Sequence, residues 1–318
     1  MTASHHHHKP SRSLLVGRRQ FIFSVIILLL LAYALVPQAD TLWRSLEIIR
    51  QATPWTVATA VALTALTYIL AAEIYRLLLK HPIPFRVVVL AQTATALTAR
   101  IVPVGIGTMG FNAFFLRKQR HSLSEALAAV ATNNGLGVAG HLTLLCIVAA
   151  FAPLPTMPET SLGWHTVSWA AFVVAAVILL LTWSDWIWRK ATGLLVGVIQ
   201  AISGYRQNYG DVLLAFAASM CLSIVYALAL TATCQAVGII LPFNQILVIY
   251  SIGLLAGTVT PTPGGLVGVE AGMIAGFSAY DIPTEVAVAV TLLYRLITYW
   301  LPIIPGYLAF RAVQRRYL

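Results

Sequence analysis

Apolar runs long enough to cross a membrane recur along this chain of 318 residues, and they limit its possible folds more than any other feature. Two of them read FIFSVIILLLLAYALV (21–36) and WAAFVVAAVILLLTW (169–183), and 59% of all residues are hydrophobic. A helix needs about 20 apolar residues to span a bilayer, where its backbone must satisfy its own hydrogen bonds. The sequence therefore predicts an all-α, polytopic membrane protein whose single membrane domain occupies residues 1–318.

The basic residues are distributed in a way that argues against a nucleic-acid partner. The chain has 20 Lys and Arg against 10 Asp and Glu, for a formal net charge of +10. These cations lie in short clusters between the apolar segments rather than on one contiguous basic face, so we expect no nucleic-acid binding. The three cysteines lie inside apolar segments without metal-ligand spacing. We expect no metal site and no cofactor.

Several apolar segments are too short to cross a membrane alone. The pieces 87–99 with 109–116, and 245–259 with 265–280, are better interpreted as paired half-helices around a broken centre. The remaining segments predict six spans, at 20–36, 55–79, 123–151, 167–188, 211–237 and 284–310.

Orientation follows from the positive-inside rule. Basic clusters precede the first span, follow the second, and follow the first half-helix pair, so this pair is expected to enter and leave the membrane from the cytoplasmic side. The linkers around the second pair contain no Lys or Arg, which places it on the outer side. We expect two opposed re-entrant hairpins, both termini in the cytoplasm, and a location in the cell inner membrane.

The two broken regions align with each other without a gap. PVGIGTMGFN (103–112) matches PTPGGLVGVE (261–270), which pairs Pro103 with Pro261, Gly107 with Gly265 and Asn112 with Glu270. The chain is thus expected to hold an inverted-topology repeat, with halves at about 20–151 and 167–310, and a substrate site near the midplane between discontinuous helices. The alternative is that these prolines and glycines only kink helices and let them pack closely.

Three charged residues are candidates for the site. Glu270 follows the PTPGG break, and Arg295 lies about eleven residues into the last span. Charges at that depth are costly and indicate a pathway or a mutual ion pair, which here are compatible alternatives. Arg100 ends the first half-helix and is expected either to cap its carbonyl end or to meet an anionic head group.

No sequence motif indicates enzyme chemistry. GIGTMG (105–110) satisfies a dinucleotide-binding pattern, but no strand precedes it and no βαβ unit surrounds it. The chain has no Walker P-loop, GxSxG or HExxH motif. We expect a protein that is not an enzyme.

The stretches TPTPGGLVGVEAGMIAGF and LLYRLITYWLPIIPGYLAF resemble the transmembrane-region family of lysylphosphatidylglycerol synthases, a flippase-like membrane domain. Members of that family handle membrane lipids, so the resemblance implies a lipid substrate. It points to six site residues, Pro261, Pro263, Gly264, Gly265, Glu270 and Arg295. Relatives often carry an Asp where this chain has Asn112 and an ER pair where it has Asn133 and Asn134, so the first half has lost charge.

We therefore expect a lipid translocase that moves a polar-headed phospholipid or polyprenyl-linked lipid between leaflets, through a midplane cavity between the two hairpins. Two alternatives stay open: an ion-coupled transporter of a small soluble solute, and a non-catalytic membrane partner in lipid-linked glycan synthesis. A homo-oligomer is compatible with the sequence.

Overall fold

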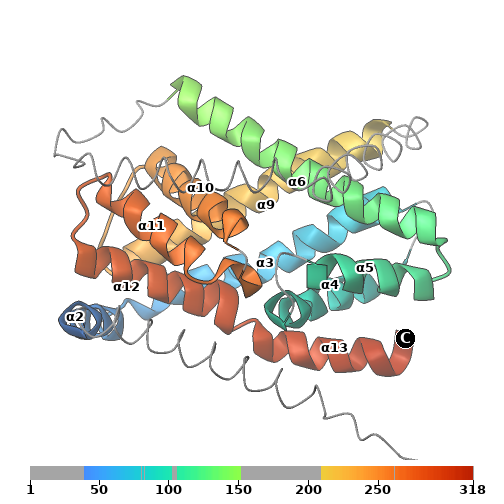
Figure 1. The fold of residues 1–318 in the computed structure, drawn as a ribbon, viewed down its shortest axis with the longest axis horizontal. Helices are drawn as coiled ribbons and strands as arrows, with labels where there is room; N and C mark the ends of the chain where they lie inside the picture. The colour runs from blue at the N-terminus through green and yellow to red at the C-terminus, as the bar shows by residue number, and fades with distance from the viewer. Residues whose placement is uncertain are drawn as a thin grey trace, which may run out of the picture.

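The computed structural model describes residues 39–79, 81, 83–101, 106–151, 209–260 and 262–317, and every regular element in these ranges is a helix (Figure 1). The expected all-α class is confirmed. The expected spans at 20–36 and 167–188 lie outside the described residues. The described elements, in chain order, are α2 (Ala39–Arg50), α3 (Pro54–Leu78), α4 (Phe85–Ile101), α5 (Ile106–Lys118), α6 (Leu123–Phe151), α9 (Tyr209–Ala236), α10 (Phe243–Val259), η2 (Pro263–Gly265), α11 (Gly268–Ser278), α12 (Thr284–Arg295), η3 (Leu296–Trp300) and α13 (Ile303–Tyr317).

Three of the described stretches are long and apolar enough to cross a membrane: Pro54–Leu78, Tyr209–Ala236 and Thr284–Tyr317. The first two, α3 and α9, pack against each other through the middle of the bundle (Figure 1). Small residues make that approach close, because Ala60 of α3 shares a buried cluster with Ala232 and Ala236 of α9. Between apolar helices in lipid, such close van der Waals packing replaces the hydrophobic effect as the main source of association.

Two pairs of short helices form hairpins. The helices α4 and α5 pack on each other, as do α10 and α11, and in Figure 1 the two pairs lie on opposite sides of the bundle. Glycines bring α10 and α11 together: a Cβ added to Gly272 would lie 2.8 Å from the Ile252 carbonyl oxygen. The element η2, at the break of the second hairpin, contacts α4 of the first. The break of the second hairpin therefore meets α4 of the first inside the bundle.

The last expected span, 284–310, lies within the candidate span Thr284–Tyr317, but it is not one regular helix. It consists of α12, a π-helical turn η3, and α13 (Figure 1). Pro302 is the physical reason, since it has no N–H to donate to the carbonyl four residues earlier and its ring disfavours a continuous α-helix. The Leu301 N–H consequently donates to the Leu296 carbonyl, 2.8 Å away, in the wider π register.

The short helix α2 was not expected from the sequence, because it lacks an apolar run. It packs against α12, where Ser45 is fully buried. The Ser45 hydroxyl is 2.7 Å from both the Thr41 and the Glu285 carbonyl oxygens. A polar side chain thus fixes α2 to the start of α12.

His121, in the turn between α5 and α6, gives the fold a pH dependence. Burial lowers its pKa below the ordinary histidine value; Glu125 opposes this shift and His81 adds to it. Because the unfolded chain binds this proton more readily than the folded chain, its contribution to stability is complete above the ordinary pKa and is lost as the pH falls below it. We expect His121→Gln to reduce the difference in melting temperature between pH 7.5 and pH 5.5 in detergent.

The neighbouring His81 supplies the control for this measurement. Its ring centroid lies 5.8 Å from that of His121, but its side chain is exposed. His81→Gln is expected to leave most of the pH dependence in place. An equal effect of the two substitutions would contradict the assignment to His121.

Candidate functional site

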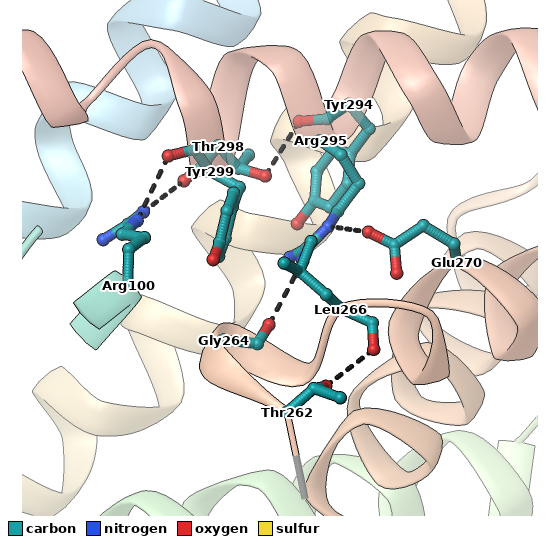
Figure 2. Close-up of polar contacts among 9 residues, drawn as sticks. All are labelled: Arg100, Thr262, Gly264, Leu266, Glu270, Tyr294, Arg295, Thr298 and Tyr299. Carbon is teal, nitrogen blue, oxygen red and sulfur yellow. Dashed lines mark hydrogen bonds and ion pairs between the residues drawn. The ribbon is translucent and has the colours of Figure 1, made fainter. Parts of the chain in front are cut away.

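The break between α10 and α11 is held in an unusual backbone conformation. Gly264 and Gly265 have φ values of 63° and 65°, and Val267 has φ 73°. Glycine adopts such values without strain, whereas a β-branched residue there is a conformational outlier. The Thr262 hydroxyl donates to the Leu266 carbonyl at 2.6 Å and closes the loop (Figure 2). Strain held at the tip of a membrane hairpin is typical of a functional site.

This loop presents Glu270 to Arg295. Glu270 lies in the first turn of α11 and Arg295 is the last residue of α12, and the Arg295 Nε donates to Glu270 Oε1 at 2.6 Å (Figure 2). The two side chains are 21% and 10% exposed. The ion pair anticipated from the depth of these two charges is confirmed as a contact.

The other polar atoms of Arg295 and Glu270 lie in different surroundings. The Arg295 Nη2 donates to the Gly264 carbonyl at 3.1 Å, and its guanidinium lies 4.3 Å from the centre of the Tyr299 ring. The other carboxylate oxygen of Glu270, Oε2, is buried and has no hydrogen-bond partner among the described residues. The Glu270 carboxyl thus lies at the positive end of α11, with Oε2 available to accept a further hydrogen bond.

Arg100, at the end of α4, reaches the same place from the other hairpin. Its Nε and Nη2 donate to the Tyr299 and Thr298 carbonyls, each at 3.1 Å, and its guanidinium lies 4.9 Å from the Tyr299 ring centre (Figure 2). Pro302 cannot donate to the Thr298 carbonyl, so Arg100 satisfies a group that the helix break exposes. Arg100 thus binds carbonyls of another helix, and not the carbonyl end of its own helix as one of the two expectations had it.

Removal of the Arg100 donors is expected to weaken the contact between the first hairpin and η3. Arg100→Leu removes the donors to two partly buried carbonyls and should lower the free energy of unfolding by about 2 kcal/mol. Arg86→Leu, at the exposed start of the same helix, is the matched control and should have little effect. Thermal unfolding in detergent measures both, and equal losses would contradict the role of Arg100.

Asn112 lies elsewhere, in the interior of the first hairpin. It is only 1% exposed, and its Oδ1 accepts from Gln92 Nε2 at 3.0 Å. Together with Asn133 and Asn134 it lines a cavity of about 180 Å³ between α3, α4, α5, α6 and α9. The alignment that paired Asn112 with Glu270 therefore joins residues with different neighbours.

The remaining expected site residues are the helix breakers. Gly107 lies in the first turn of α5 and Pro263 begins η2. Pro103 and Pro261 lie outside the described residues. Among the described residues, no group of three or more His, Cys, Asp or Glu is placed to hold a metal ion.

Tyr299 is the site residue that sequence reasoning missed. Its ring lies beside both guanidinium groups, and a Cβ at Gly264 would overlap its Cε2 atom. A signal was present in the sequence, because residues four apart share a helix face and Tyr299 follows Arg295 by four. The hairpin break, α12 and the tip of α4 all converge on this ring.

The helical fold and the buried charges at a helix break define a polytopic helical membrane protein with a polar site inside its bundle. The chain belongs to the family described as the lysylphosphatidylglycerol synthase TM region, which it matches over residues 20–306. It is also similar to the UPF0104 membrane protein MJ1595 of Methanocaldococcus jannaschii, with 48% identity over 67 residues. That match covers 21% of this chain and 20% of the relative, so it spans about a fifth of each protein.

Proposed function

We propose that this protein is a lipid translocase, not an enzyme, that moves a polar-headed membrane lipid between leaflets of the cell inner membrane. The observation that carries the proposal is the partly buried Glu270–Arg295 pair at a strained hairpin tip, where Glu270 Oε2 has no partner among the described residues. A charged pair inside a membrane bundle is costly and usually belongs to a substrate or ion pathway. The family takes its name from the membrane region of a synthase that makes a modified lipid, lysylphosphatidylglycerol. Membership of this family supports a lipid as the substrate.

The proposed layout has six spans and two re-entrant hairpins that enter from opposite sides, within an inverted repeat of residues 20–151 and 167–310. Support comes from the two hairpins on opposite sides of the bundle and from the contact between η2 and α4. The substrate head group would pass between the tips, near Glu270 and Arg100, while its acyl chains stay in the bilayer. Both termini would lie in the cytoplasm.

Reconstitution tests the proposed activity directly. Purified protein in liposomes should move fluorescent phospholipids or polyprenyl lipids to the outer leaflet faster than protein-free liposomes do, measured by quenching with an impermeant reductant. Glu285→Gln, in the first turn of α12 and outside the site, is a matched control for Glu270→Gln and should keep full activity. Absence of movement of every lipid in the panel would overturn the proposal, and uptake of a soluble solute would favour the ion-coupled transporter.

Cysteine labelling tests the opposed hairpins. In a background without the three native cysteines, Ser278→Cys at the end of α11 and Ser124→Cys at the start of α6 place one exposed thiol beside each hairpin. An impermeant maleimide added to intact cells should label position 278 at once and position 124 only after permeabilisation. Labelling of both positions from one side would rule out the inverted arrangement.

A further inference from the structure

A second polar site lies inside the bundle, away from the Glu270–Arg295 pair. Four carboxamide side chains, Gln92, Asn112, Asn133 and Asn134, line the cavity of about 180 Å³, which we call the amide cavity. Threonines and tyrosines also line it, among them Thr67, Thr95, Thr108 and Tyr226, and the apolar part of the wall is formed by Ala71, Met109 and Leu222. No Asp, Glu, Lys or Arg is among the described residues that line it.

One donor of this wall lacks a partner. The Oδ1 of Asn112 accepts from Gln92, and the Tyr75 hydroxyl also interacts with the Asn112 side chain. The residue is only 1% exposed, and apart from this contact with Tyr75 its Nδ2 has no acceptor among the described residues, so at least one of the two N–H groups is unsatisfied. A buried donor left unsatisfied costs about 1–3 kcal/mol, so this amide calls for an acceptor atom from outside the protein.

The chemistry of the wall selects the kind of ligand. Carboxamides and hydroxyls each supply donors and acceptors, which matches a ligand whose hydroxyls do the same. A phosphate or ammonium group would lose its hydration without meeting an opposite charge in the wall, and that loss is expensive in an apolar bundle. The guanidinium of Arg100, which contacts Tyr68 of the wall, already donates to the Thr298 and Tyr299 carbonyls.

The size of the cavity agrees with a single small polar group. Its volume of about 180 Å³ corresponds to roughly six water molecules at about 30 Å³ each. We propose that the amide cavity binds an uncharged, hydroxyl-rich group, a sugar ring or a glycerol, as the head of a membrane lipid. The claim that this hydroxyl-rich group belongs to a lipid rests on the proposed function. The claim that the amide cavity binds such a group does not.

Equilibrium binding to the whole protein in phosphatidylcholine nanodiscs tests this inference without requiring transport and without a sugar detergent that would compete. The probe is radiolabelled monoglucosyl diacylglycerol, and the comparison lipids are diacylglycerol and phosphatidic acid. We expect the glucosyl lipid to bind at least tenfold more tightly than either. Equal binding of diacylglycerol or phosphatidic acid would overturn the inference.

Variants of the wall connect binding to the amide cavity. Asn133→Leu and Asn134→Leu keep the side-chain size and remove the hydrogen bonds, and each should weaken binding of the glucosyl lipid at least tenfold. Asn244→Leu, in the first turn of α10, is the matched control and should bind normally. Melting temperatures confirm that the variants are folded, and unchanged binding by folded Asn133→Leu and Asn134→Leu would overturn the inference.

Free glucose separates the two sources of the same chemistry. Weak or no competition by glucose supports a lipid head group as the ligand. Competition at the concentration of the glucosyl lipid would support the amide cavity as a hydroxyl site and contradict the proposed lipid transport. Binding of the glucosyl lipid without its movement in liposomes would overturn the proposed function alone.

Discussion

Glu270→Gln is expected to abolish lipid translocation and to lower the free energy of unfolding by about 2 kcal/mol, below the usual range for breaking a buried ion pair because Gln still accepts a hydrogen bond. Glu270 Oε1 accepts from Arg295 Nε, and its Oε2 is buried without a partner. The neutral amide leaves the Arg295 charge without its counter-ion and removes the free carboxylate oxygen. Thermal unfolding and the liposome assay measure the two effects separately.

The double variant Glu270→Gln with Arg295→Gln distinguishes structure from transport. Removal of both charges eliminates the unpaired guanidinium, so stability should recover much of the loss seen in either single variant. Transport should not recover, because the carboxylate is still missing. Recovery of both properties would mean that the pair only holds the hairpin in place. Glu285→Gln controls for a loss of charge elsewhere on α12.

Gly264→Ala is expected to be the most damaging small substitution at the site, with a loss of about 2–4 kcal/mol in the free energy of unfolding. Two effects add: the left-handed φ of 63° disfavours any residue with a Cβ, and that Cβ would overlap Cε2 of Tyr299. The displaced ring would also leave the guanidinium groups of Arg100 and Arg295. Melting temperature and lipid transport should therefore fall together.

Gly238 provides a control for the backbone effect alone. It has φ 82° in the turn after α9, with no atom within 4 Å of an added Cβ. Gly238→Ala should cost only about 1 kcal/mol, the strain of the left-handed conformation. In a Tyr299→Ala background, where the ring is absent, Gly264→Ala should cost only about 1 kcal/mol more, the backbone strain alone. Equal losses for the two glycine variants would contradict the clash.

The sequence by itself determined where most helices begin and end. The expected segment 123–151 is the helix Leu123–Phe151, and the expected halves 245–259 and 265–280 correspond to Phe243–Val259 and Gly268–Ser278. Apolar length and the Pro and Gly breaks are local properties, so they can be read along the chain. The second half-helix starts three residues late because left-handed backbone occupies the loop before it.

The Glu270–Arg295 contact could also be predicted from the sequence. Two opposite charges in apolar segments each require a partner, and few other charged residues lie in these segments. The partners of Arg100 were not accessible in the same way. It binds the Thr298 and Tyr299 carbonyls, 198 and 199 residues away, which become available only where Pro302 interrupts the helix.

Only the tertiary structure brought the polar residues of five helices to one cavity. Asn112, Asn133 and Asn134 were visible in the sequence as unusual side chains, but a helix pattern does not say which neighbouring helices supply their partners. Packing of α3, α4, α5, α6 and α9 decided that Gln92 satisfies Asn112 Oδ1, while at least one N–H of its Nδ2 has no acceptor among the described residues. Hydrogen-bond satisfaction of a buried amide depends on long-range contacts, whereas the cost of burying it is local and appears in the sequence.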